Sequence, residues 1–146
     1  MRTKILTKIA ATAGMLCLIL LASSGLQPNS VVYAQDQKVY EMRTYTVAPG
    51  RLPALLKRFS GGEVDLFVKH GMTSVGYWVP DDEELSENTL VYMLAHDSRE
   101  AAAASWKAFG ADPLWPPMRA ASVADGPIVT DVQNLFLDPT NFSPLN

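Results

Sequence analysis

The amino-acid sequence predicts a single α+β domain whose elements follow the order β-α-β-β-α-β. Side chains alternate between two faces over residues 39–47, which is typical of a strand. Apolar residues recur at helical spacing over residues 52–70 and again over residues 99–110. Three further segments are rich in sheet-forming side chains: residues 73–79, 89–95 and 128–137. This order is the ferredoxin-like split motif, so we expect helices on one face of the sheet and a bare opposite face.

The first strand, predicted over Val39–Val47, has one polar face. Because successive side chains of a strand point to opposite faces, Glu41, Arg43 and Tyr45 share a face. Pro49-Gly50 then turns the chain. A strand with two charged groups and a tyrosine on one face is a candidate wall for a pocket.

The first helix is predicted to begin near Leu52. It ends at Lys69-His70-Gly71, where a basic last turn is followed by glycine. Pro53 is compatible with this helix because it lies in the first turn. Gly61-Gly62 interrupts the apolar pattern. We expect a kink at these glycines, with a true break into two helices as the alternative.

The second helix is expected to open at Asp97-Ser98-Arg99-Glu100. In this prediction Asp97 is the cap, and Glu100 reaches back to it in a capping box. Trp106 lies in the apolar stripe of the helix and is expected to pack in the core. A further short helix or turn is expected over residues 112–121, before the last strand.

Residues 1–34 have the layout of a secretory signal peptide. Three basic residues precede Ile9–Ala22, an apolar or small stretch of 14 residues, whereas a membrane-spanning helix needs about 20. Val32-Tyr33-Ala34 offers a cleavage site before Gln35, and an uncleaved membrane anchor is the alternative. We therefore expect a secreted or periplasmic protein with three parts: a signal peptide over residues 1–34, a short polar leader over residues 35–38, and one domain over residues 39–146.

The expected mature chain is acidic and has no cysteine. Cleavage would leave 112 residues and would remove Cys17 together with three of the 12 basic residues. All 15 acidic residues would remain, so the net charge becomes about −6, which disfavours nucleic-acid binding. The sequence has no Gly-rich phosphate loop, nucleophile elbow or metal-ligand spacing. ATP, NAD and serine-hydrolase chemistry are therefore disfavoured, and we expect neither a cofactor nor a metal.

Glu41 and Arg43 are the first candidates for chemistry. Their side chains can pair because they lie two residues apart on one strand face, and arginine offers a rigid fork to a carboxylate. In the functional interpretation, Arg43 recognises an anion or enol and Glu41 accepts a proton. The alternative is a structural ion pair at a dimer seam.

Two tyrosines and two histidines are the remaining candidates. Tyr45 and Tyr92 suit the wall of a pocket, although packing within the sheet explains them equally well. His96 ends a strand on the same face as Tyr92 and is the better candidate for a general base. His70 lies in the last turn of a helix, where a cation complements the helix dipole.

Several short segments form an ordered set along the chain: Tyr40-Glu41-Met42-Arg43-Thr44-Tyr45, Lys69-His70-Gly71-Met72, Gly76-Tyr77-Trp78, Leu90-Val91-Tyr92-Met93-Leu94-Ala95-His96, Ser105-Trp106-Lys107-Ala108-Phe109 and Asp125-Gly126-Pro127. Taken together, these segments resemble the NIPSNAP family. The resemblance runs from about residue 39 to residue 145. It implies a dimeric α+β barrel, in which two ferredoxin-like sheets close over a shared interior. It also implies a family defined by fold more than by chemistry, whose related barrels include cofactor-free monooxygenases, haem-degrading enzymes and small-molecule binders.

The sequence is compatible with three functions. The first is binding of a small aromatic or anionic molecule inside the barrel of a homodimer. The second is a cofactor-independent monooxygenase or isomerase, in which His96 or Glu41 moves a proton. The third is a structural or interaction module whose barrel is filled by side chains. No nucleic-acid partner is expected, and a membrane is expected only through an uncleaved signal. The residues expected to line the ligand site are Glu41, Arg43, Tyr45, Tyr92 and His96.

Overall fold

A computed structural model describes residues 37–145 of the chain. The predicted signal peptide, residues 1–34, lies outside the described residues, as do the first two residues of the predicted polar leader. None of the helices between residues 37 and 145 is long and apolar enough to cross a membrane. The strands are β1 (Val39–Val47), β2 (Thr73–Trp78), β3 (Thr89–His96) and β4 (Val129–Leu137), and the α-helices are α1 (Leu52–Arg58), α2 (Val64–Lys69), α3 (Arg99–Ala111) and α4 (Trp115–Ser122).

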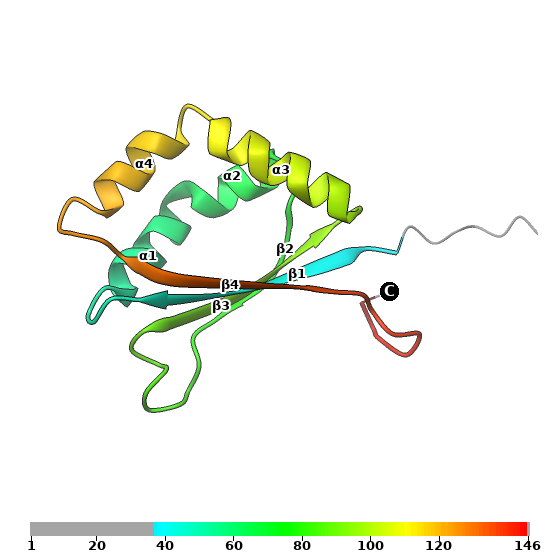
Figure 1. The fold of residues 1–146 in the computed structure, drawn as a ribbon, viewed down its shortest axis with the longest axis horizontal. Coiled ribbons are helices and arrows are strands. Elements are labelled where there is room, and N and C mark those ends of the chain that lie inside the picture. The colour runs from blue at the N-terminus through cyan, green and yellow to red at the C-terminus, as the bar shows by residue number, and fades with distance from the viewer. Residues whose placement is uncertain (1–36, 146) are drawn as a thin grey trace, which may run out of the picture. The chain divides into compact units, whose positions relative to one another are not determined.

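The four strands form one sheet in the order β2-β3-β1-β4. Every neighbouring pair is antiparallel, with β1 between β3 and β4. All the helices lie on one side of this sheet, and the other side is bare (Figure 1). The predicted α+β class and ferredoxin-like order are therefore confirmed.

A π-helical segment, Phe59–Glu63, joins α1 to α2. Gly62 has a φ of 127°, which only glycine adopts without strain. A Cβ atom at Gly62 would also lie 2.9 Å from Cε of Met118. The chain stays helical on both sides of this residue, so the kink predicted at Gly61-Gly62 is correct. Glu63, the last residue of this segment, is buried in the protein interior.

The core fills the space between the helices and the sheet. Its centre is a group of aromatic rings in which Phe59 and Phe67 each contact Tyr92. Tyr45 contacts Tyr92 edge-on, with the ring centroids 5.3 Å apart. The hydroxyl of Tyr92 donates to the hydroxyl of Tyr45 at 3.0 Å. Tyr45 and Tyr92, predicted to line a ligand site, therefore lie among the buried aromatic residues of the core.

The start of α3 differs from the prediction. Ser98, in extended conformation, is the N-cap, and its hydroxyl accepts a hydrogen bond from the backbone N–H of Ala101 at 3.1 Å. Asp97, predicted to cap this helix, instead forms an ion pair with Lys38. Both Asp97 and Ser98 are good capping residues, and the sequence does not indicate which one adopts the extended backbone that a cap requires. The element bounds otherwise agree with the prediction to within three residues, the largest difference being the start of α4 at Trp115, where residue 112 was expected.

The bare face of the sheet presents large apolar side chains. Met42 of β1 lies opposite Met93 of β3 and Leu135 of β4 in the strand register. Leu135 is 53% exposed and Trp78 is 50% exposed. The Trp78 ring lies against Gly76, where an added Cβ atom would lie 2.5 Å from the indole. The bare face is therefore an exposed apolar surface.

Candidate functional site

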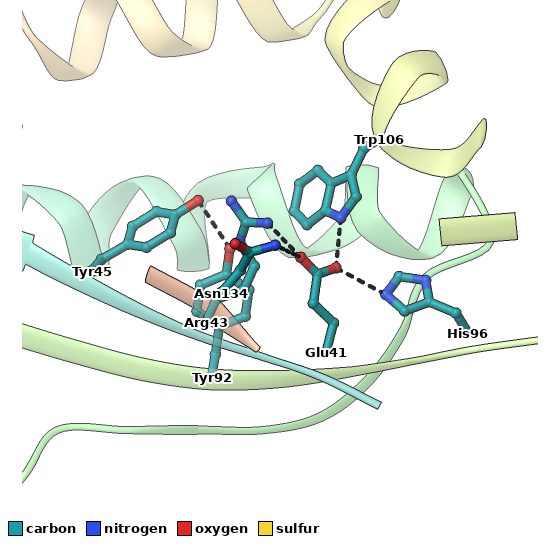
Figure 2. A network of polar contacts seen from close by, with 7 residues as sticks. All are labelled: Glu41, Arg43, Tyr45, Tyr92, His96, Trp106 and Asn134. Carbon is teal, nitrogen blue, oxygen red and sulfur yellow. Dashed lines mark hydrogen bonds and ion pairs between the residues drawn. The ribbon is translucent and has the colours of Figure 1, made fainter. Parts of the chain in front are cut away.

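A network of polar side chains is centred on the carboxylate of Glu41 (Figure 2). Oε1 accepts hydrogen bonds from Nη1 of Arg43 at 2.5 Å and from Nδ2 of Asn134 at 3.5 Å. Oε2 accepts one from Nε1 of Trp106 at 2.7 Å and faces Nε2 of His96 at 3.2 Å. Glu41 is only 1% exposed, so four donors surround one buried carboxylate.

Four elements of the fold position this network. Glu41 and Arg43 share a face of β1, and Asn134 lies opposite Arg43 on β4. His96 is the last residue of β3, and Trp106 projects from α3 toward Glu41 on the sheet. The sequence predicted that Glu41, Arg43 and His96 would come together. It did not predict the contributions of Trp106 and Asn134, since Trp106 was expected only to pack and no motif marks Asn134.

The network lies on the helix-covered face of the sheet, which corrects its predicted place inside a barrel. Strand alternation groups Glu41, Arg43 and Tyr45 correctly but does not determine which face the helices cover. The neighbouring strand β3 determines which face of the sheet the helices cover. Leu90 and Leu94 of β3 lie opposite Tyr45 and Glu41, and both are buried. These side chains make this face the apolar one, so the helices pack on it and enclose the charged pair.

Glu41 is held in its ionised form. Burial by itself raises the pKa of Glu41, but hydrogen bonds from His96, Trp106 and Arg43 outweigh burial and lower the pKa to about 2. Both carboxylate oxygens are also occupied. An ionised carboxylate with this pKa is a poor proton acceptor at neutral pH. The geometry therefore favours a role for Glu41 in orienting its neighbours.

His96 is oriented by Glu41. Its Nε2 faces the carboxylate, so the neutral ring carries its proton on Nε2 and leaves Nδ1 as the basic nitrogen. Nδ1 is buried and has no hydrogen-bond partner among residues 37–145. A histidine oriented by a carboxylate through one nitrogen, with the other nitrogen unpaired, has the arrangement of a general base.

Several N–H groups of the Arg43 guanidinium make no hydrogen bond to another described residue. Its guanidinium lies 4.4 Å from the centre of the Trp106 ring and 5.7 Å from that of Tyr45. Of its five N–H groups, only one on Nη1 is hydrogen-bonded to another described residue, and Nε is buried without a partner there. The side chain is 16% exposed, and the neighbouring Asn134 is exposed. Solvent therefore reaches the network on the side of β4.

A second buried ion pair lies in the same interior. Nε of Arg58 donates to Oε2 of Glu63 at 2.7 Å, and both side chains are buried. Burial raises the pKa of Glu63, and Arg58 offsets this effect only in part. The sequence prediction missed this pair, although Arg58 and Glu63 flank the two glycines that the prediction singled out.

His70 is not part of the Glu41 network. It ends α2, and its Nε2 lies 2.7 Å from Oδ2 of Asp112, which also accepts a hydrogen bond from Lys69. This contact joins the end of α2 to the segment between α3 and α4. Within residues 37–145, no group of three or more His, Cys, Asp or Glu side chains could hold a metal ion.

An apolar cavity of about 420 Å³ lies beside the aromatic core. Phe59, Tyr77 and Leu90 are among its lining residues. Phe59 and Tyr77 also contact Tyr92, so the buried aromatic rings separate this cavity from Arg43. This cavity and two others, of about 430 and 200 Å³, have none of the five predicted ligand-binding residues in their linings.

Comparisons with known proteins place the chain among related structures. The NIPSNAP family model matches residues 40–144. A solved structure of a NIPSNAP family protein of unknown function from Agrobacterium tumefaciens is 27% identical, with a TM-score of 0.66, and the match covers 77% of this chain and 96% of that one. An uncharacterised NIPSNAP domain protein from Burkholderia xenovorans is 26% identical, with a TM-score of 0.62 and coverage of 73% and 98%.

A more distant structure has the same fold. It is a monooxygenase from Streptomyces coelicolor in complex with nanaomycin D, 19% identical, with a TM-score of 0.52 and coverage of 73% of this chain and 90% of that one. At this identity the likeness concerns the fold alone. No curated protein matches the chain.

Proposed function

The chain belongs to the NIPSNAP family, and from that premise we propose that it binds a small, partly aromatic anion through Arg43. The observation that supports this proposal is the set of unpaired N–H groups on the Arg43 guanidinium. A buried donor left without a partner costs about 1–3 kcal/mol, and a ligand oxygen that accepts from it recovers that cost. The bound group is a carboxylate, a phenolate or an enolate.

The surroundings of Arg43 favour an aromatic ligand. Trp106 and Tyr45 flank the guanidinium with aromatic rings, and the exposed amide of Asn134 adds a second donor on the accessible side. An aromatic acid placed there can pair its carboxylate with Arg43 and contact the Trp106 ring. The ligand site in this proposal lies between the sheet and the helices of one protomer.

We expect Arg43→Gln to weaken the binding of an aromatic carboxylate about 10- to 100-fold, because hydrogen bonds to a charged group contribute about 1.5–3 kcal/mol. The measurement is calorimetric titration with salicylate. The matched control is Arg99→Gln, since Arg99 also lies over an aromatic ring, that of Phe136, and also pairs with an acid, Asp138. Equal loss in both variants, or no saturable salicylate binding to the wild type, would contradict the proposal.

We also propose that the protein forms a homodimer through the bare face of the sheet. The exposed apolar side chains of Leu135 and Trp78, with Met42 and Met93 between their strands, support this assignment. Native mass spectrometry is expected to detect a dimer that Leu135→Lys converts to a monomer. Val68→Lys replaces a side chain that is 62% exposed on α2, on the opposite side of the sheet, and serves as the control. A wild-type monomer would rule out the dimer.

A second candidate function is proton transfer without a cofactor, as in an isomerase or a monooxygenase. The unpaired Nδ1 of His96, oriented through Nε2 by Glu41, supports this candidate. We expect the protein to exchange an acidic C–H of an aromatic β-diketone for deuterium, and His96→Gln to abolish that exchange. NMR measures the exchange, and His70→Gln provides the control because His70 is bound to Asp112. Equal exchange rates in the two variants would exclude His96 as the base.

The site of action is proposed to be the periplasm or the cell exterior. This proposal rests on the basic and apolar segments of residues 1–34 and on the small residues before Gln35. The intact mass of the protein recovered from an exporting host tests it. A chain that begins at Gln35 supports the proposal, and an uncleaved chain that stays in the cytoplasm contradicts it.

A further inference from the structure

A cavity of about 430 Å³ lies between α1 and α4, away from the Glu41 network. Arg51, Lys57 and Arg58 line it on the α1 side, and Met118 and Ala121 line it on the α4 side. Ligand sites in proteins commonly measure about 300–1,000 Å³. The volume of this cavity is therefore suited to a small organic molecule.

The lining of this cavity is cationic. Asp125 is the one acidic residue in the lining, against three basic ones. The charge of Arg58 is balanced by Glu63, at 2.7 Å. The side chain of Lys57 makes no ion pair or hydrogen bond with any residue between 37 and 145. The cavity therefore has positive charge that the described part of the chain does not neutralise.

Arg51 is fixed in place, with one donor unused. Its Nη2 donates to the backbone carbonyls of Ser122 at 3.2 Å and Gly126 at 3.1 Å, which connects the start of α1 to the last residue of α4 and to the chain after it. Its Nε is buried and has no partner among the described residues. A guanidinium held by two carbonyls is pre-organised to bind an anion, because the side chain loses little further conformational entropy when the ligand binds.

The remaining walls of the cavity are apolar and adaptable. Ala54 and Ala121 are small, and Met118 is a flexible side chain that fills irregular space. Such walls suit a hydrocarbon chain better than they suit an inorganic anion, which needs donors on several sides. We propose that this cavity binds a carboxylate with a short aliphatic chain, with Lys57 and Arg51 at the carboxylate and Met118 against the chain.

Gly61 is a position from which a larger side chain can fill the cavity. It lines the cavity, its φ is not positive, and a Cβ atom added there has no atom within 4 Å. Gly110 of α3 has the same open space at its Cβ position but does not line the cavity. Gly61→Leu and Gly110→Leu therefore form a matched pair of variants.

The test is calorimetric titration of the exported chain with octanoate. We expect saturable binding to the wild type and to Gly110→Leu, loss of binding in Gly61→Leu, and binding weakened about tenfold in Lys57→Gln. Lys57 is exposed, so its replacement leaves the fold intact even if Gly61→Leu perturbs it. Octanol, which lacks the charge, is expected to bind at least tenfold more weakly than octanoate.

Three outcomes would overturn the proposal: no saturable octanoate binding to the wild type, equal binding to Gly61→Leu and Gly110→Leu, or equal affinity for octanoate and octanol. The Arg43→Gln variant separates this site from the proposed aromatic-anion site. Octanoate binding that persists in Arg43→Gln and is lost in Gly61→Leu assigns the ligand to the cavity between α1 and α4. The reverse pattern assigns it to Arg43 and rules out the second site.

Discussion

Replacement of Glu41 by alanine is expected to lower the free energy of unfolding by about 3–5 kcal/mol, the range measured when one partner of a buried ion pair is removed. The variant leaves Arg43 charged in the protein interior without its partner at 2.5 Å. It also leaves Trp106 Nε1 and His96 Nε2 without the acceptor that they share. An unpaired buried donor is costly, so the three losses act in the same direction.

This destabilisation is expected to depend on pH. The folded-state pKa of Glu41 is about 2, below its ordinary value of 4.5. The stabilisation that this carboxylate contributes is therefore fully present above pH 4.5 and is lost as the pH falls through about 2. Urea unfolding of the wild type and of Glu41→Ala at several pH values measures it. The difference between the two proteins is expected to be largest near pH 7 and to shrink toward pH 2.

The control for Glu41→Ala is Glu84→Ala, a carboxylate exposed in the loop before β3. This control variant is expected to unfold like the wild type. If Glu41→Ala loses less than about 1 kcal/mol at pH 7, the carboxylate is not the centre of the network. A difference that does not change with pH would show that the folded-state pKa of Glu41 is not lowered.

Replacement of Tyr92 by alanine is expected to cost about 3–5 kcal/mol, as for other large buried aromatic residues. The Tyr92 ring is fully buried and contacts Tyr45, Phe59, Phe67 and Tyr77. Tyr92→Phe keeps the ring and removes only the hydroxyl that donates to Tyr45, so its expected cost is about 0.5–1.5 kcal/mol. Guanidinium unfolding of the three proteins measures both effects.

The outcome for Tyr92 separates a core residue from a ligand-lining residue. A core residue gives a large loss of stability with alanine and a small loss with phenylalanine. If Tyr92→Ala unfolds at the same guanidinium concentration as the wild type, then the ring faces a solvent-filled site and is not part of the packed core. The expected result would leave Arg43 and Asn134 as the residues through which a ligand reaches the network.

The sequence predicted the fold well because its signals are local. Alternation over Val39–Val47 and helical spacing after Leu52 are properties of neighbouring residues, and the element order followed from them. The kink at Gly61-Gly62 was predicted for the same reason. The cap of α3 was misassigned to Asp97 because two adjacent residues could both serve, and only the backbone conformation of Ser98 decides between them.

The candidate site was predicted less completely because its geometry depends on distant residues. The alternation of side chains along β1 correctly placed Glu41 and Arg43 on one face. Which face of the sheet the helices cover was determined by the apolar side chains of β3. Asn134 enters the network only through the register of β4 against β1, and that register is set by contacts across the sheet. Trp106 was predicted only to pack in the core. Nothing in the sequence near Trp106 indicates that its indole N–H donates to the carboxylate of Glu41, 65 positions earlier in the chain.

The contact between Gly76 and Trp78 has a consequence for how this sheet can change over evolutionary time. As long as the indole of Trp78 lies against residue 76, any side chain larger than hydrogen at that position must displace the indole. The two positions are therefore coupled, and a lineage that replaces Trp78 by a small residue also removes the restriction on residue 76. The reverse order passes through an intermediate in which the indole is pushed away from the sheet. Substitutions at these two positions are thus expected to occur in one order, with residue 78 changing first.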